Sequence, residues 1–255
     1  MKANKIGKTI IKVINNAVNL TVLTVIMLLV AFAGYALWDS NQIYETAGKQ
    51  NYAVYKPTIQ NEGKSFKELQ SINPEVIAWL HVYGTNINYP VTQGHDNMKY
   101  VNTNAEGFYS LSGAIFLDAD NNRNFDDFNS ILYGHHMEKK AMFGEIGTFS
   151  DKKVFDAHRY GSLYFNGKEH GIEFIAFIHT DAYDYEIFRP GVREKNRRAY
   201  LDNLLAKSTH VRYTKVTEQN QIILLSTCSS SSTNGRDILI GKIIDEIYSD
   251  SFINK

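Results

Sequence analysis

The chain has 255 residues, with 27 Lys and Arg against 27 Asp and Glu, eight His and one Cys. Its 44% hydrophobic and 21% charged residues are typical of a folded protein, and its zero net charge argues against a strongly basic nucleic-acid-binding protein. The single cysteine excludes an intrachain disulfide and any zinc or iron–sulfur site built from several cysteines.

The charges are unevenly distributed along the chain. Residues 1–38 hold four Lys and no acid; removing these four from the 27 leaves 23 basic against 27 acidic side chains, a net charge of −4 for the rest. Leu20 to Trp38 is an uncharged run of 19 residues, which as a helix spans roughly 28 Å, close to the thickness of a bilayer core. Lys on its N-terminal side predicts a cytoplasmic N-terminus and an exported C-terminal body.

We therefore predict a cytoplasmic basic stub over residues 1–19, a transmembrane anchor over 20–38, a juxtamembrane helix or spacer over 39–64 and one folded domain over 65–255. A buried core helix is disfavoured because the segment is apolar on all faces. A cleaved signal peptide is the stronger alternative, since Ala31 and Ala33 provide small residues for cleavage, although apolar character continues beyond them. An uncleaved anchor and a cleaved signal peptide would both export the C-terminal body.

The predicted elements of the body begin with two short helices. Ser65 and Glu68 form a capping-box pattern before Phe66 and Leu69, and the segment 73–75, Asn-Pro-Glu, is typical of a second helix start. Short apolar runs then predict β-strands, of which the first two form a hairpin around Gly84: 80–83, 86–91, 113–117, 130–133, 162–165, 172–178, 221–227 and 238–244. Eight such strands favour a mainly β fold, a closed or nearly closed barrel, with one late helix over 194–208.

Three positions carry side chains suited to nucleophilic catalysis. Cys228, the only cysteine, ends an apolar strand, and Arg236 begins the next one, where a fixed cation can favour a thiolate or an oxyanion. Another strand ends in Gly134, His135 and His136, and an imidazole can exchange a proton with a cysteine nucleophile. Only one of two adjacent His on a strand can face the cysteine. A buried, inert cysteine is the alternative for an exported protein, and a metal site at the His pair is disfavoured because no cluster of acidic ligands accompanies it.

These segments resemble the sortases, and in particular their class B. The segment 225–228, Leu-Ser-Thr-Cys, resembles the sortase signature Leu-x-Thr-Cys, and 133–137 resembles the Gly-His turn. Further class B-like segments follow in family order at 73–80, 87–91, 113–118 and 142–144, so the resemblance covers about residues 65–245. It implies an eight-stranded sortase-type β-barrel in which the helix at 194–208 is the extra helix of that class.

The resemblance implies a peptidase and acyltransferase of the transpeptidase type. Cys228 would be the nucleophile, His135 the general acid and base, and Arg236 the residue that orients the substrate and stabilises the oxyanion. Substrate contacts are implied for four positions: Ser226, Thr227, Asn97 and Val101. Asn97 and Tyr100 match an Asn-x-x-Tyr segment of the class, with Val101 where Leu is more usual.

The expected substrates are exported surface proteins that carry a C-terminal sorting motif, and the expected acceptor is the amine of a peptidoglycan precursor or cross-bridge. A pilin Lys is the alternative acceptor. The enzyme would act outside the cell membrane of a Gram-positive bacterium, held by its N-terminal helix, with no cofactor, metal or nucleic acid. Asp118 to Arg123 resembles the start of a calcium loop, but Arg123 stands where Gly is required, which favours a solvated turn. An L,D-transpeptidase is disfavoured because Thr227 precedes Cys228, and a non-catalytic surface-anchored interaction protein is the other alternative.

Overall fold

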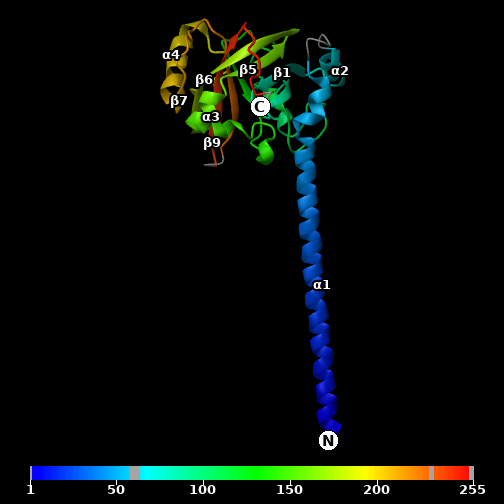
Figure 1. Ribbon diagram of the computed structural model, residues 1–255. Coiled ribbons are helices and arrows are strands. Elements are labelled where there is room, and N and C mark those ends of the chain that lie inside the picture. The colour runs from blue at the N-terminus through cyan, green and yellow to red at the C-terminus, as the bar shows by residue number, and fades with distance from the viewer. Residues whose placement is uncertain (1, 58–63, 230–232, 253–255) are drawn as a thin grey trace. The chain divides into compact units, whose positions relative to one another are not determined.

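The computed structural model describes residues 2–57, 64–229 and 233–252, and the chain divides into two units, residues 1–45 and 46–255. Helix α1 (Lys2–Thr46) supplies the first unit and ends at the first residue of the second (Figure 1). Its segment Gly7–Gln42 is long and apolar enough to cross a membrane and contains the whole predicted span 20–38. Thr21 and Thr24 donate hydrogen bonds to the carbonyls of Ala17 and Leu20, so both hydroxyls are satisfied without water.

The second unit contains a closed β-barrel. In the described part of the chain eight strands form a ring in the order β5-β1-β2-β3-β4-β8-β9-β6, which the pairing of β6 with β5 closes. The β2–β3 and β4–β8 pairs are parallel and the other pairs are antiparallel. The prediction of an eight-stranded barrel is therefore confirmed. The two-residue strand β7, which the sequence did not predict, pairs with β6 outside the ring. The strands are β1 (Val76–Val82), β2 (Asn88–Thr92), β3 (Ile115–Leu117), β4 (Asn129–Tyr133), β5 (Tyr160–Phe165), β6 (Lys168–Asp181), β7 (His210–Val211), β8 (Ile222–Cys228) and β9 (Gly235–Ile244).

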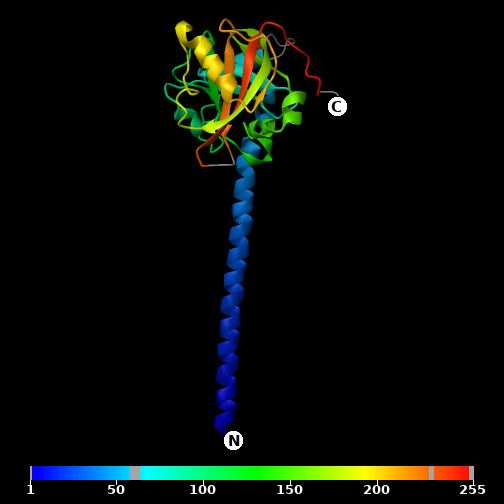
Figure 2. The same cartoon turned by 90° about the vertical axis from the view of Figure 1, so that its left-hand side faces the viewer.

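Because successive side chains of a strand point to opposite faces of the sheet, the barrel has two hydrophobic cores, one inside it and one outside. Every strand of the ring contributes to the inner core, for example Leu80, Tyr89, Ile115, Leu132, Leu163, Phe174, Ile223 and Leu239. The intervening residues of β6, β8 and β9 face outward, where Ile222, Leu224 and Ile238 form an outer core with Tyr200, Leu201 and Leu204. These last three residues belong to α4 (Glu194–Lys207), which confirms the predicted late helix and covers the sheet in Figure 2.

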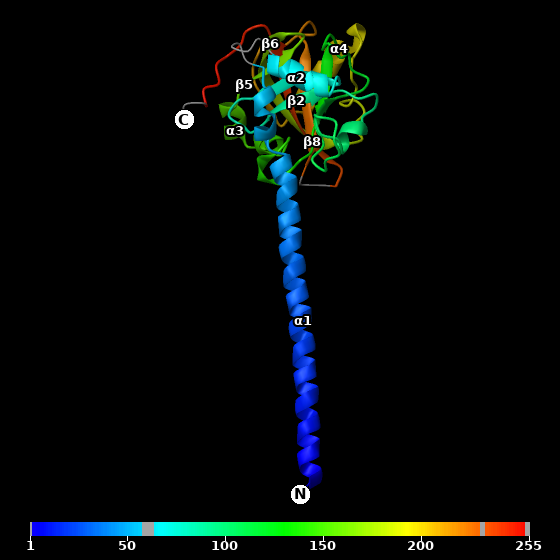
Figure 3. The ribbon, with the colours of Figure 1, turned by 90° about the vertical axis from the view of Figure 1, so that its right-hand side faces the viewer.

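Two predictions at the start of the domain are wrong. Helix α2 (Lys64–Ile72), seen in Figure 3, includes Ser65, so Ser65 is not its N-cap, although Phe66 and Leu69 are buried as expected. Residues 73–75 form a turn before β1 rather than a second helix. The Asn73 Oδ1 accepts a hydrogen bond from the Glu75 N–H, and its Nδ2 donates to the Tyr100 hydroxyl. Because β1 is buried on both faces, its continuous apolar run does not distinguish strand from helix.

The remaining helices are short; η1 (Lys49–Tyr55) precedes α2, and the others lie in connections between strands. The Asp151 side chain caps α3 by accepting a hydrogen bond from the Lys153 N–H. Gly84, with φ of +77°, forms the turn of the predicted β1–β2 hairpin, which is confirmed by the pairing of Leu80 with Tyr89. The short helices are η1 (Lys49–Tyr55), η3 (Lys99–Val101), η4 (Glu138–Lys140), η5 (Ile146–Ser150) and α3 (Lys152–Ala157).

Candidate active site

The single cysteine lies at the end of a rigid strand. Residues Ile222 to Thr227 of β8 are buried, and Cys228, the last residue of the strand, is exposed. Cys228 is the register partner of Arg236 on β9. Because residues paired across an antiparallel ladder share a face of the sheet, the thiol and the guanidinium project from the same side. The buried strands therefore fix two of the three predicted catalytic side chains side by side.

Strand β4 brings the third side chain to the same place. Tyr133 pairs with Ser226 in the parallel β4–β8 ladder, and the Gly134 N–H donates a 3.2 Å hydrogen bond to the Ser226 carbonyl. His135 follows directly, and its Nε2 lies 2.8 Å from the carbonyl oxygen of Val101. A carbonyl can only accept a hydrogen bond, so Nε2 carries a proton and Nδ1 is left to exchange one.

A glycine allows the Val101 carbonyl to occupy this position. Gly113 has φ of +59°, and a Cβ there would lie 2.6 Å from the Val101 oxygen and 2.5 Å from the Tyr100 oxygen. Both contacts are to backbone, which cannot move aside as a flexible side chain can. Gly113 therefore permits the close approach of two chain segments that orients the His135 ring.

All seven predicted site residues line one cavity of about 410 Å³: Asn97, Val101, His135, Ser226, Thr227, Cys228 and Arg236. His136, the neighbour of His135, lies in a different cavity, as expected for adjacent residues in extended backbone. The prediction missed five lining residues: Phe116, Tyr133, Gly134, Ala182 and Phe188. Phe116, Tyr133 and Gly134 lie within the segments that resemble the sortases. Ala182 and Phe188 lie in the connection between β6 and α4, where the sequence has no comparable signal.

A buried carboxylate holds one wall of this cavity in place. Asp118 Oδ2 accepts hydrogen bonds from the Tyr133 hydroxyl at 2.8 Å and from Asn97 Nδ2 at 3.0 Å. Asn97 Oδ1 in turn accepts from the Ala119 N–H. Burial, together with the Asp118 carboxylate, raises the pKa of the Tyr133 phenol, so Tyr133 stays protonated and donates. Asp118 thus fixes two lining side chains with one oxygen atom.

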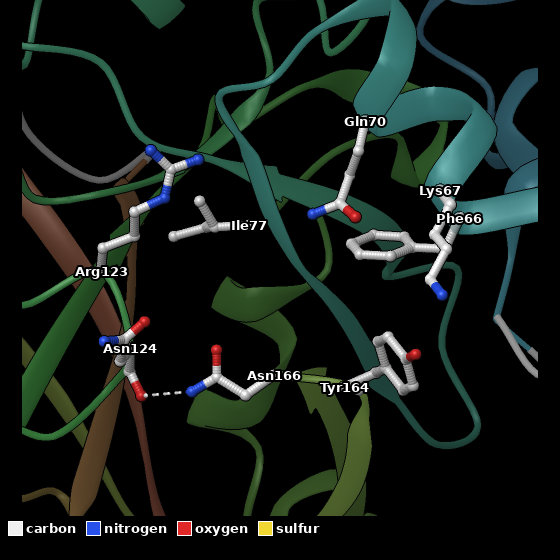
Figure 4. A pocket seen from close by; sticks show the side chains of 9 residues that line it. Phe66, Lys67, Gln70, Ile77, Arg123, Asn124, Tyr164 and Asn166 are labelled. Carbon is white, nitrogen blue, oxygen red and sulfur yellow. Dashed lines mark hydrogen bonds between the residues drawn. The ribbon is translucent and has the colours of Figure 1, made fainter. Parts of the chain in front are cut away.

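Apart from Asp118, the turn that resembles the start of a calcium loop has no contact with the lining of this cavity among the described hydrogen bonds of residues 120–123. In the Asp118–Arg123 turn the Asn121 Nδ2 donates to Asp127 Oδ2 at 2.7 Å, and no group of three potential metal ligands occurs among the described residues. Figure 4 shows a separate cavity of about 190 Å³ between α2 and the 123–124 loop, lined by Lys67, Arg123 and the ring of Tyr164. None of the predicted site residues lines it.

A closed β-barrel that brings a thiol, an imidazole and a guanidinium into one cavity defines a cysteine-dependent acyl-transfer enzyme. The family model of the sortase domain matches residues 80–243. Sortase B of Staphylococcus aureus is 30% identical over 183 residues, which cover 70% of this chain and 74% of that protein. The chain belongs to the sortase family, class B, whose members are cysteine transpeptidases, and the resemblance seen in the sequence is confirmed.

Two solved structures are also similar. Sortase B from the type II pilus of Streptococcus pneumoniae is 48% identical, covers 71% of this chain and 99% of that chain, and has a TM-score of 0.63. A class B sortase of Streptococcus pyogenes involved in pilus biogenesis is 40% identical, with coverage of 71% and 99% and a TM-score of 0.65.

Proposed function

We propose that this protein cleaves a C-terminal sorting motif of exported proteins and transfers the acyl fragment to a primary amine. The supporting observation is that Cys228, His135 and Arg236 reach one cavity from three strands or strand ends. The Cys228 thiolate attacks the carbonyl carbon of a Thr in the motif, forming the C–S bond. The C–N bond breaks, and the departing amine takes a proton from His135. Arg236 stabilises the oxyanion of the intermediate.

A buried hydroxyl supports a role of the cavity in binding peptide. Ser226 Oγ is buried and has no hydrogen-bond partner among the described residues, and Ser226 lines the cavity on the same face of β8 as Cys228. An unsatisfied buried hydroxyl costs about 1–3 kcal/mol, and a substrate backbone group can satisfy it. We assign Ser226 and Thr227 to substrate contacts, together with Val101 and with Asn97, whose side chain also belongs to the wall held by Asp118.

The acceptor is the amine of a peptidoglycan precursor or cross-bridge. A second candidate is the Lys side chain of a pilin. The two pilus-related sortases favour this candidate, since at 48% and 40% they are more similar to this chain than Sortase B of Staphylococcus aureus is at 30%.

A peptide library tests the reaction. We expect the purified protein to cleave a subset of Thr-containing peptides and to gain the mass of the acyl fragment as a thioester. Addition of triglycine or of Nα-acetyl-lysine amide should yield the corresponding amide product, and the better acceptor separates the two candidates. Absence of any thioester with every peptide of the library would reject the proposed function.

Helix α1 is the membrane anchor in this proposal, with its Lys-bearing end in the cytoplasm and the barrel outside the cell. The full-length protein should stay in the membrane fraction after a sodium carbonate wash, and protease added to intact protoplasts should degrade the barrel. Release by the wash, or protection from the protease, would contradict this topology.

Asp118→Asn should impair binding of the sorting peptide more than the chemical step. The neutral amide keeps one acceptor oxygen but loses the carboxylate that serves both Tyr133 and Asn97, so the wall of the cavity loosens. A hydrogen bond to a charged acceptor contributes about 1.5–3 kcal/mol, which corresponds to a rise in KM of roughly 10- to 100-fold. Peptide cleavage kinetics measure the effect. The matched control is Asp120→Asn, an exposed carboxylate in the same turn, and equal kinetics in the two variants would contradict the role of Asp118.

Arg236→Lys should lower kcat/KM for peptide cleavage by about 10- to 100-fold although the charge is kept. The planar guanidinium can donate to a substrate oxyanion while its Nη1 donates to the Gly235 carbonyl at 2.9 Å, and an ammonium cannot reproduce that fork. Arg198→Lys on the exposed face of α4 is the control. Full activity of Arg236→Lys would reduce its role to the charge alone.

A further inference from the structure

A second cavity lies on the other side of the strands that carry the active site. We call it the back cavity; it has a volume of about 610 Å³, and its lining includes His136, Gly147, Phe177, His179, Ser229 and Asp237. Ser229, Asp237 and His136 each directly follow one of the three proposed catalytic residues. Because side chains alternate between the faces of a strand, the back cavity and the cavity of Cys228 lie on opposite faces at the ends of β8 and β9. Phe177, which lines the back cavity, also belongs to the inner core, so the back cavity borders that core.

One wall of the back cavity carries a buried carboxylate. Asp237 is 7% exposed and its Oδ1 lies 2.8 Å from Nδ1 of His179, its register partner on β6. Gly147 lies against this carboxylate, because a Cβ at residue 147 would lie 2.9 Å from Asp237 Oδ2 and would require that side chain to shift. Buried carboxylates are stabilised by cations and hydrogen-bond donors, so the site suits a positively charged ligand.

An unsatisfied atom in the wall also indicates a ligand. The Nδ1 atom of His136 is buried and has no hydrogen-bond partner among the described residues. Such an atom costs about 1–3 kcal/mol unless a ligand or water supplies a partner. The volume lies within the range of about 300–1,000 Å³ that is usual for small-ligand sites.

We propose that the back cavity binds the acceptor substrate through its primary ammonium group. The proposal rests on the proposed function, because a transpeptidase must hold a second substrate while the acyl fragment occupies the cavity of Cys228. The two cavities differ in the charged group that faces them: the Arg236 guanidinium lines the cavity of Cys228, and the carboxylate of Asp237, the next residue, lines the back cavity. An ammonium group is therefore directed toward Asp237, whose register partner on β8, Thr227, immediately precedes Cys228.

The transfer step balances with the groups that line the two cavities. The bound ammonium releases one proton to the Asp237–His179 pair and becomes a neutral amine. The neutral amine is no longer held by Asp237; it passes the end of β8, where Ser229 follows Cys228, and its nitrogen attacks the thioester carbonyl carbon. The C–N bond forms and the C–S bond breaks. The second proton passes from the nitrogen to His135, and Cys228 leaves as a thiolate.

The assignment of the back cavity to the acceptor is tested with the full-length protein, by measuring how much of the acyl-enzyme is hydrolysed and how much is transferred to an added amine. Asp237→Asn should raise the concentration of triglycine or Nα-acetyl-lysine amide needed for half-maximal transfer at least about 10-fold. Peptide cleavage without added amine should stay unchanged. Capture by hydroxylamine, which is small and at high concentration needs no binding site, should also stay unchanged. A saturation curve equal to that of the wild type would overturn the assignment.

Two further variants keep the test decisive. Gly147→Ala places a methyl group against Asp237 from the opposite wall and should weaken amine saturation independently, which decides the matter if Asp237→Asn does not fold. Asp245→Asn removes the same charge at an exposed position after β9 and should behave as the wild type. Unchanged amine saturation in Gly147→Ala and Asp237→Asn, or equal loss of peptide cleavage and transfer, would reject the acceptor site. Failure of the wild type to form a thioester would instead reject the proposed function.

Discussion

Replacing Cys228 with Ala should abolish cleavage of sorting-motif peptides, a loss of at least about 10⁴-fold in kcat. The reaction depends on a C–S bond to the substrate, and an alanine methyl group cannot form one. The fold should survive, because Cys228 is exposed at the end of β8 and contributes nothing to either core. The thermal unfolding midpoint of the variant should therefore stay within a few degrees of the wild type.

Thiol labelling makes this experiment specific. Because the chain has one cysteine, a methanethiosulfonate reagent should add once to the wild type and not at all to Cys228→Ala. Labelling of the wild type should stop peptide cleavage. Thr233→Ala, an exposed change in the same β8–β9 connection, is the matched control and should retain full activity. Undiminished peptide turnover in Cys228→Ala would end the proposal that this thiol is the nucleophile.

The sequence predicted the parts of the molecule that depend on local pattern. Apolar runs marked each of the eight strands of the ring, and the face of α4 marked the late helix, because burial on one or both faces leaves a periodic or continuous apolar signature. The same reasoning failed at Asn73. Its side chain bonds to Tyr100 and to the Ala105 carbonyl, which are 27 and 32 residues away, and a local pattern cannot reveal such partners.

The sequence predicted the reactive residues of the site. It did not predict the residues that hold those reactive residues and the cavity wall in position. Cys228, His135 and Arg236 stand at strand ends, and their chemistry is visible in the residue types. Asp118 supports the cavity wall but was given no role in the site: the sequence placed it at the end of the sortase-like segment 113–118 and at the start of a solvated turn. Its role depends on one oxygen atom that meets Tyr133 and Asn97, 15 and 21 residues away. The Val101 carbonyl, which holds His135, is backbone and leaves no mark in the sequence.

The pairing of β4 with β8 explains why three distant residues form one site. Tyr133 and Ser226 are in register although 93 positions separate them, and shifting this ladder by one residue would turn His135 to the opposite face. Both strands end at the same edge of the barrel because the pair is parallel. The catalytic geometry thus depends on register, which the inner and outer cores determine together.

His135→Ala should lower the rate of thioester formation by about 10²- to 10⁴-fold, whereas His136→Ala should leave it near the wild-type value. His135 lines the cavity of Cys228, and its Nε2–H is held by the Val101 carbonyl, so Nδ1 is available to move a proton in the transition state. His136 has the same chemistry but lines the back cavity. Comparing the two variants therefore tests whether catalysis requires an imidazole in the cavity of Cys228 or an imidazole at either of the two adjacent positions.

The measurement is the single-turnover rate of thioester formation with a cleaved peptide and no added amine, so that the acceptor site does not affect it. Methanethiosulfonate labelling of Cys228 and the thermal unfolding midpoint should be recorded for both variants, because a His135→Ala protein that has lost its fold would also lose the rate. Loss of thioester formation in His136→Ala with retention in His135→Ala would reverse the assignment. It would require the back cavity, rather than the cavity shared with Arg236, to supply the proton.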